Sequence, residues 1–228
     1  MYLMSDQKRS TKNFMTNHKN VRTLAAALLT IGSLAGGANG ANLLLNPSFE
    51  DDDASGSPFF IRSTSAPSSW VQIGDGVDII HNDYTQPTLP VLVDASDGSQ
   101  FLDLNQAGIL GGIYQDVAVS FGETYQLTLD AVRWATNSGG SIQYSLIDPT
   151  DSSVIASDTY AVADAWTERV LSGTATSSIL RVQIESIVSP QAAPGIDNTS
   201  FTLVPEPSSI LLLGVSAFGF ISRRRRIN

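Results

Sequence analysis

Short runs in which apolar and polar residues alternate fill the middle of this sequence and limit what it can fold into. In Thr124–Val132, alternate residues from Tyr125 to Ala131 are apolar, and most of the residues between them are polar. Side chains of a strand point to opposite faces in turn, so this pattern is typical of a half-buried strand. No window of about twelve residues shows the apolar stripe of a helix. The sequence therefore predicts an all-β fold, an antiparallel β-sandwich of jelly-roll type with roughly eight to ten strands.

Turn residues divide these runs. Asn137–Gly140 separates Thr124–Val132 from Ile142–Leu146, so we expect these two runs to form a hairpin. The residues from 51 to 69 carry little regular pattern and are expected to form a long surface loop. Further strands are expected at Ser99–Leu104, Gly112–Val119, Val154–Ala156, Trp166–Leu171, Leu180–Ile187 and Ile196–Val204.

The C-terminus carries a different kind of signal. Pro205, Glu206 and Pro207 precede an apolar run of 15 residues, Ser208–Ser222, and then four arginines, Arg223, Arg224, Arg225 and Arg226. As a helix the run would measure about 22 Å, shorter than a hydrocarbon core of roughly 30 Å. The arginines resist translocation and hold this end in the cytoplasm. We interpret the tail as a transient membrane anchor; an ordinary single-pass anchor and an amphipathic terminal helix are the alternatives.

This arrangement resembles the PEP-CTERM sorting tails of Gram-negative bacteria. The resemblance implies that an exosortase cuts near Pro205, Glu206 and Pro207. It also implies a passage through the inner membrane by way of a short transmembrane helix. The product would then be released to the cell surface or the extracellular matrix.

The N-terminus agrees with export. Five basic residues precede an apolar stretch, Leu24–Leu34, and small residues follow up to Gly40 and Ala41. This is the pattern of a signal peptide with its helical apolar core, and signal peptidase is expected to cut after Gly40. A start at Met15 would give a leader of more usual length. The chain thus divides into a signal peptide (1–40), a β-sandwich domain (41–204) and a sorting tail (205–228).

The central domain is strongly acidic. Residues 41–204 contain 20 Asp and Glu residues, four Arg and no Lys, which gives a net charge of −16. A nucleic-acid partner is excluded, because binding phosphates needs clustered Lys or Arg. The chain has no cysteine, which excludes disulfides, Cys-ligated zinc and a cysteine nucleophile. His81 is the domain's single histidine, so a multi-histidine metal site is excluded as well.

Four short motifs, in this order along the chain, give the domain a second resemblance. Asn42–Glu50 opens it, Gly112–Val117 lies ahead of Gly122–Tyr125, and Ile196–Phe201 closes it. The set is similar to the galactose-binding-like jelly rolls, which include many carbohydrate-binding modules. In that fold the opening and closing segments lie together and a structural calcium ion often joins them.

The resemblance implies Glu50 and Asp197 as carboxylate ligands of Ca²⁺, with backbone carbonyls near Asn46–Ser48 completing the shell. The alternative is that both carboxylates hydrogen-bond the local backbone. Asp51–Asp53 is read as a solvated acidic run, and Asp94–Gly98 lacks the remaining acids of an EF-hand loop and is read as a turn.

Sugar recognition needs an aromatic face for C–H groups, with amides and carboxylates for hydroxyls. Trp70, Tyr84 and Trp134 are the predicted ligand-binding residues; Trp166 is a further aromatic candidate, and Gln72, Asn82 and Asn105 are polar types nearby. For any single tryptophan, packing in the core or at a sheet edge is the alternative. Trp70 and Tyr84 lie in loop-like sequence and are preferred.

Catalytic signals are weak. A Ser-His-Asp triad would have to use His81, no Gly-x-Ser-x-Gly elbow accompanies it, and His81 is expected in an exposed loop. We therefore expect an exported, non-enzymatic module that binds extracellular polysaccharide. The alternatives are a structural protein of the biofilm matrix without a ligand pocket and a glycoside hydrolase on the same fold.

Overall fold

The computed structural model describes residues 40–56, 60–63, 66–74, 76–85, 93–105, 109–135, 140–188 and 194–205. The signal peptide and the sorting tail lie outside this part of the chain, apart from Gly40 and Pro205 at its ends. Within the described ranges, no helix has the length and apolar character needed to cross a membrane. The predictions for both terminal helices are therefore not addressed by the structure.

The described residues form eleven β-strands, against the eight to ten expected. The additional strands are short and lie early in the domain; one of them, β1, falls inside the segment 51–69 that was predicted to be only a loop. The strands are β1 (Phe60–Ser63), β2 (Val71–Gly74), β3 (Val77–His81), β4 (Gln100–Asp103), β5 (Gly111–Ala118), β6 (Thr124–Arg133), β7 (Ser141–Asp148), β8 (Ser153–Ala161), β9 (Thr167–Thr174), β10 (Ile179–Val188) and β11 (Pro194–Leu203).

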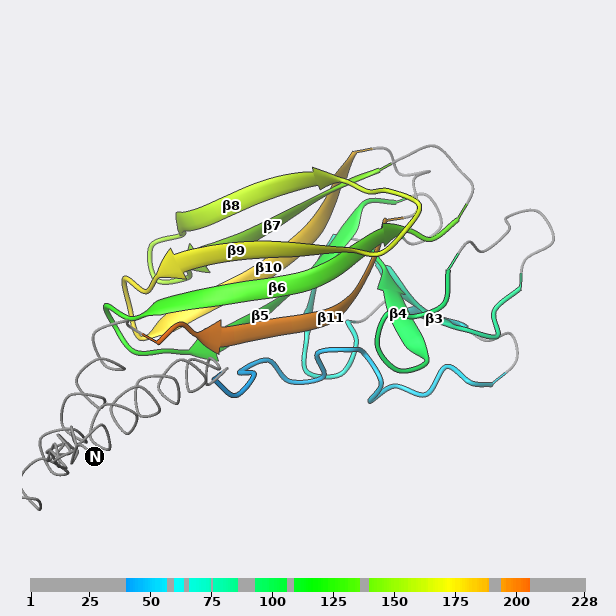
Figure 1. Ribbon diagram of the computed structural model, residues 1–228, viewed down its shortest axis with the longest axis horizontal. Helices are drawn as coiled ribbons and strands as arrows, with labels where there is room; N and C mark the ends of the chain where they lie inside the picture. Colours follow the sequence, from blue (N-terminus) through cyan, green and yellow to red (C-terminus); the bar gives the residue numbers. More distant parts are fainter. Residues whose placement is uncertain are drawn as a thin grey trace, which may run out of the picture. The chain divides into compact units, whose positions relative to one another are not determined.

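These strands build two sheets that pack face to face (Figure 1). The six-stranded sheet has the order β1-β3-β4-β11-β6-β9, and the five-stranded sheet has the order β2-β5-β10-β7-β8. Every pairing between neighbouring strands is antiparallel. The predicted antiparallel sandwich is confirmed.

The expected hairpin between 124–132 and 142–146 is wrong. β6 lies in the six-stranded sheet, whereas β7 lies in the five-stranded sheet, so the chain crosses from one layer to the other between them. The true hairpin partner of β7 is β8, reached through the turn after Asp148. Turn residues indicate that a chain reverses, but they do not indicate whether it returns in the same sheet.

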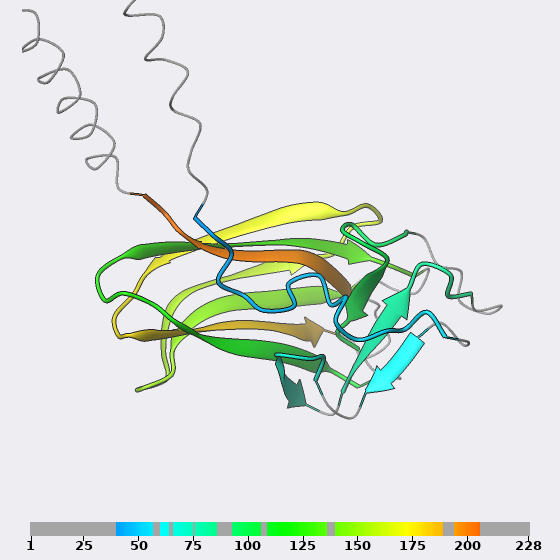
Figure 2. The same cartoon turned by 90° about the horizontal axis from the view of Figure 1, so that it is seen from below.

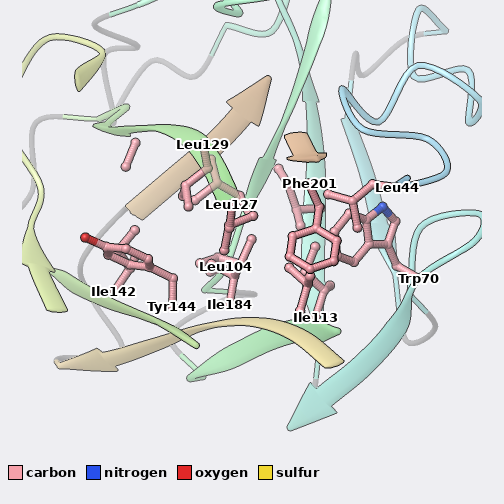
Figure 3. Packing of buried hydrophobic residues seen from close by; sticks show 14 of the residues in the cluster. Leu44, Trp70, Leu104, Ile113, Leu127, Leu129, Ile142, Tyr144, Ile184 and Phe201 are labelled. Atoms are coloured by element: carbon pink, nitrogen blue, oxygen red, sulfur yellow. The ribbon is translucent and has the colours of Figure 1, made fainter. Parts of the chain in front are cut away.

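Alternation along the strands produces the core. Tyr125, Leu127 and Leu129 of β6 point between the sheets, where they meet Ile113 and Ile184 from the opposite layer. Figure 3 shows Leu44, Trp70 and Phe201 at one end of this cluster and Tyr144 at the other, with its hydroxyl directed outward. All eleven strands and this core lie between residues 40 and 205.

The two ends of the domain meet. The N-terminal segment runs beside β11 (Figure 2), with the Leu43 N–H donating to the carbonyl of Phe201 at 2.9 Å. A Cβ atom added at Gly40 would lie 3.3 Å from the carbonyl oxygen of Leu203, so the two segments are close there as well. Strand directions bring the β5–β6, β7–β8 and β9–β10 turns to the same end of the sandwich. We call this the terminal end.

Candidate functional site

The outer surface of the five-stranded sheet carries an ordered set of polar side chains. On β5, β10 and β7 the inward residues join the core, so the residues between them face away from it. We name this surface the polar face. It comprises Tyr114, Asp116, Gln143, Ser145, Ser157, Thr159, Arg181, Gln183 and Glu185, with Val71 and Ile73 at the β2 edge.

The register of the strands arranges these side chains in rows. Tyr114 lies opposite Gln183, Gln183 lies opposite Ser145, and Ser145 lies opposite Ser157. Neighbouring strands are about 4.8 Å apart, so this row extends roughly 14 Å across four strands. A second row joins Glu185 to Gln143 and Thr159. Ser145 is buried, and its hydroxyl lies 3.0 Å from that of Ser157. The groups that the polar face offers to a ligand are therefore those of Tyr114, Gln143, Ser157, Thr159 and Gln183.

Arg181 is held firmly on this surface. Its Nε and Nη2 donate to the two carboxylate oxygens of Asp116 at 2.8 and 2.9 Å. Its guanidinium carbon lies 3.8 Å from the centre of the Tyr114 ring. Hydrogen bonding to Asp116 raises the pKa of Arg181 above its ordinary value. A two-point ion pair combined with ring stacking fixes the guanidinium before any ligand arrives.

The amides and hydroxyls of the polar face are partly linked to one another. Gln183 Nε2 donates to Glu185 Oε1 at 3.3 Å, and Gln143 Nε2 donates to Ser157 Oγ at 3.2 Å. Each of these groups can form more hydrogen bonds than these, because an amide has two N–H groups and two lone pairs. Two carboxylates, Asp116 and Glu185, and one guanidinium leave the surface close to neutral charge. Its chemistry suits a ligand rich in hydroxyls.

Trp70 was a predicted ligand-binding residue, and the structure places it in the core. Only 6% of it is exposed, its ring packs 5.9 Å from that of Phe49, and its Nε1 donates to the Asn46 carbonyl at 3.1 Å. Almost no ring face is left for a sugar. This placement corresponds to the packing alternative; a role of Trp70 in ligand binding is untested.

Tyr84 and Trp134, the other two predicted residues, are brought together on the outer side of the six-stranded sheet. Their ring centres are 6.1 Å apart, and Phe101 lies 6.0 Å from Trp134. Trp134 is buried, Tyr84 is partly exposed, and Trp166 packs against the same cluster. These aromatic residues form a second, smaller core beneath the segment 93–99, and their binding of a ligand also stays a prediction.

The polar residues predicted near these aromatic residues are buried or form hydrogen bonds to the nearby backbone. Asn82 Oδ1 accepts from the Ala95 N–H at 2.7 Å, Gln72 Nε2 donates to the Gly74 carbonyl at 3.1 Å, and Asn105 is buried. The prediction that His81 lies in an exposed loop is wrong. His81 ends β3 opposite Gln100, and only 13% of its side chain is exposed.

Glu50 and Asp197 hold the same loop from two sides. Glu50 Oε1 accepts from the N–H groups of Ser99 and Gln100 at 2.8 and 2.7 Å. Asp197 Oδ2 accepts from the N–H groups of Ser96 and Asp97 at 2.8 and 2.9 Å. The opening and closing segments of the domain are thus joined through residues 96–100.

Burial makes Asp197 an unusual carboxyl. Its desolvation raises its pKa to about 7, although three backbone N–H groups favour the ionised form, and the charge of Asp97 adds to the rise. Asp130 lies nearby, accepting from the Ser96 hydroxyl and from Asn198 Nδ2. A cation at this position would relieve the cost of ionising Asp197.

The predicted calcium shell fits these residues in part. The carboxylates of Glu50 and Asp197 face one loop, as the prediction requires. The carbonyls of Asn46 and Pro47 do not fit, because they already accept hydrogen bonds from Trp70 and Thr199. No group of three or more His, Cys, Asp or Glu arranged for a metal ion is present in the described ranges. Calcium at this site stays a prediction.

Sequence reasoning missed the polar face. Its signal was present in the alternation of Arg181, Gln183 and Glu185 with apolar residues, and in the same spacing at Gln143 and Ser145. Register across four strands, which a single sequence does not reveal, brings them onto one surface.

Solved structures with this fold include enzymes and binding modules. The Stig cyclase Fisc from Fischerella sp. TAU matches with a TM-score of 0.54 at 14% identity, over 72% of this chain and 97% of the cyclase. A cyclase from Fischerella sp. TAU gives 0.53 at 17% identity, over 71% and 96%. TmCBM61, solved in complex with β-1,4-galactotriose, gives 0.51 at 14% identity, over 72% and 99%. At these identities the likeness establishes the fold alone and confirms its resemblance to carbohydrate-binding jelly rolls.

Two family profiles match the sequence. Residues 203–226 match the PEP-CTERM protein-sorting motif, which confirms the identification of the tail and indicates export with membrane-anchored processing in a Gram-negative bacterium. Residues 42–202 match the family DUF642, described as proteins of unknown function. No curated protein sequence matches the chain. The DUF642 match spans the β-sandwich and most of the chain. This protein therefore belongs to the DUF642 family and carries a PEP-CTERM sorting motif at its C-terminus.

Proposed function

We propose that this protein binds an extracellular polysaccharide without cleaving it, through the polar face of its five-stranded sheet. The observation that carries the proposal is the row that runs from Tyr114 and Gln183, past the buried Ser145, to Ser157, beside the guanidinium of Arg181. It joins an aromatic ring to amide, hydroxyl and guanidinium groups, the combination that sugar recognition needs.

The spacing of the rows favours an extended glycan. Strands lie about 4.8 Å apart, which is close to the length of one sugar unit in an extended β-linked chain. A glycan lying across the sheet would therefore place successive sugars over successive strands. TmCBM61, of the same fold, was solved with a β-1,4-linked galactotriose, which makes such chains the first ligands to test.

Charge favours a neutral glycan. Asp116 neutralises Arg181, and Glu185 adds one negative charge to the polar face. The domain as a whole carries a net charge of −16. An acidic polysaccharide would therefore approach against a repulsive field, whereas a neutral polysaccharide would not.

We propose a binding module in preference to an enzyme. His81, needed for a Ser-His-Asp triad, is largely buried, and its Nδ1 accepts from the Asp83 N–H at 3.1 Å. Glycoside hydrolase activity predicts release of reducing ends from polysaccharides, and cyclase activity predicts turnover of a small molecule. Either result with purified residues 41–204 would replace the present proposal.

The sorting motif supports a role outside the cell. We propose that signal peptidase and exosortase remove the two ends, that the inner membrane holds the chain only transiently, and that the domain then acts at the cell surface or in the extracellular matrix. In a biofilm it would contact polysaccharide through the polar face. We also propose that Ca²⁺ stabilises the loop 96–100 through Glu50 and Asp197.

A glycan array followed by calorimetry with purified residues 41–204 tests the central claim. We expect selective binding of a neutral β-linked glycan, with affinity reduced about tenfold or more in Tyr114→Ala. Val170→Ala, on the outer side of the six-stranded sheet, is the matched control and should bind normally. Uniform silence on the array would instead support a structural matrix protein, and binding that Tyr114→Ala leaves unchanged would remove the polar face as the site.

A further inference from the structure

We propose that Phe121 contacts the lipid surface while the sorting tail is attached, and that it leaves the membrane when the tail is removed. The proposal concerns the terminal end of the sandwich and is independent of sugar binding at the polar face. It assigns a membrane-contact site to the turn between β5 and β6.

Phe121 lies in a hydrogen-bonded turn and is exposed to solvent. Among the residues that the structure describes, it is the most exposed large hydrophobic side chain, at 76%. The Ser120 N–H donates to the Tyr125 hydroxyl at 2.8 Å, and the Gly122 N–H donates to the Ala175 carbonyl at 2.9 Å. Gly122 has a φ of 83°, which closes the turn without strain. These hydrogen bonds hold the backbone on both sides of Phe121, so the position of its exposed ring is fixed by the turn.

Further apolar side chains are exposed at the same end. Ile179 begins β10 and lies opposite Ala118, and Leu203 ends β11; both are partly exposed. The turn that carries Phe121 joins β5 to β6 at this end. An aqueous surface gains nothing from apolar groups collected at one end, whereas a bilayer interface accepts them.

The sorting tail brings this end close to the membrane. The Val204 N–H donates to the Thr124 carbonyl at 2.8 Å, which fixes the last strand beside the beginning of β6. The apolar run starts at Ser208, three residues after Pro205. Even fully extended, three residues cover no more than about 11 Å. Before processing, Pro205 at the terminal end is thus within about 11 Å of the start of the apolar run.

One phenylalanine is too weak an anchor by itself. Peripheral attachment through a single apolar group is marginal and reversible, and stable attachment needs a second signal. The tail provides that signal, because tethering raises the effective concentration of Phe121 at the surface. Glu123 and Asp151 are near the same turns and bring negative charge, so zwitterionic lipid is favoured over anionic lipid. Removal of the tail therefore releases the domain completely.

Tryptophan fluorescence with brominated phosphatidylcholine tests this directly. We would reconstitute residues 41–228 of Phe121→Trp in vesicles and measure quenching after subtracting the signal of the native tryptophans. Val170→Trp, on the outer side of β9, is the matched exposed control, and Phe218→Trp reports insertion of the tail. Circular dichroism confirms that each variant is folded.

We expect at least twofold stronger quenching for Phe121→Trp than for Val170→Trp, and loss of that quenching in residues 41–204. Quenching of Phe218→Trp without quenching of Phe121→Trp would overturn the proposal and leave a protein partner as the occupant of the turn. Absence of quenching at Phe218→Trp would overturn it as well, because the tether would then be missing. Retained quenching in residues 41–204 would contradict the release step. None of these outcomes affects the glycan experiment.

Discussion

The guanidinium carbon of Arg181 lies over the Tyr114 ring, 3.8 Å from its centre. The same guanidinium makes a two-point ion pair with Asp116. A side chain that is fixed before binding loses less conformational entropy when a ligand arrives. Arg181, Asp116 and Tyr114 therefore form the part of the polar face that is most firmly positioned before binding.

Replacing Arg181 by lysine should weaken polysaccharide binding about fivefold to tenfold. Lysine keeps the positive charge but loses the planar fork and the ring stacking. Calorimetry with the glycan selected on the array gives the affinity. Arg169→Lys, on the β9 side of the sandwich, is the control and should leave the affinity unchanged. Equal affinities for Arg181→Lys and the wild type would show that charge alone matters there.

Trp70→Ala should lower the free energy of unfolding by about 3 to 5 kcal/mol, because it empties a packed position in the core. Trp70→Phe should cost less, since it keeps part of the contact with Phe49. Urea titration followed by circular dichroism provides both values. A small loss of stability together with loss of glycan binding would contradict this expectation and would support Trp70 as a residue that binds sugar.

Calcium should raise the melting temperature of residues 41–204, and EGTA should reverse the rise. The expected cause is relief of the buried charge of Asp197, whose ionisation Asp97 also disfavours. Glu50→Gln combined with Asp197→Asn should abolish the response, which differential scanning calorimetry measures. An unchanged melting temperature at micromolar calcium would show that hydrogen bonds alone hold the loop 96–100.

In EGTA the domain should lose stability as the pH rises from about 4 to about 7. The pKa of Asp197 is near 7 in the fold and 3.8 without its surroundings, so the folded state binds the extra proton in this window. Its contribution is complete below pH 3.8 and is lost by about pH 7, an effect of up to about 4 kcal/mol. Burial also raises the pKa of Asp103, with the same sign. Asp197→Asn should flatten the stability profile in part, and an unaltered profile would contradict this assignment.

Tyr144→Phe should cost about 1 kcal/mol of stability. The Tyr144 hydroxyl donates to Asp158 Oδ2 at 2.7 Å and accepts from Arg169 Nε at 3.4 Å, which ties the two sheets at their β8 and β9 edges. Tyr160→Phe keeps the ring 4.5 Å from the Arg169 guanidinium and is the matched control. Urea titration of both variants gives the difference, and equal stabilities would mean that the hydroxyl bonds add nothing.

Much of the fold was predictable because strand signals are local. The alternation in Thr124–Val132 identified β6, and the motif Ile196–Phe201 lies within β11. Local signals could not show that β6 and β7 lie in different sheets, because the choice of sheet depends on long-range packing. β1 was not predicted for a different reason: a strand of four residues gives too short an alternation to recognise.

The candidate site was less predictable. Aromatic type pointed to Trp70 and Trp134, yet large aromatic side chains fill cores as readily as they bind sugars, and both are buried. Glu50 and Asp197 were correctly linked to the meeting of the two ends, since their motifs open and close the domain. Tyr114 and Arg181 were missed because their proximity arises only when β5 pairs with β10.

The pairing of the first segment with the last strand has a consequence for secretion. Asn42 donates to the Thr199 carbonyl and accepts from the Phe201 N–H, contacts that join residues more than 150 positions apart. The sheet therefore cannot be completed until nearly all of the domain has left the ribosome. A chain whose closing contact is made last stays unfolded for longer, and an unfolded chain is what a translocation channel accepts. We therefore expect this late closing contact to keep the domain in a state that can be exported before it folds.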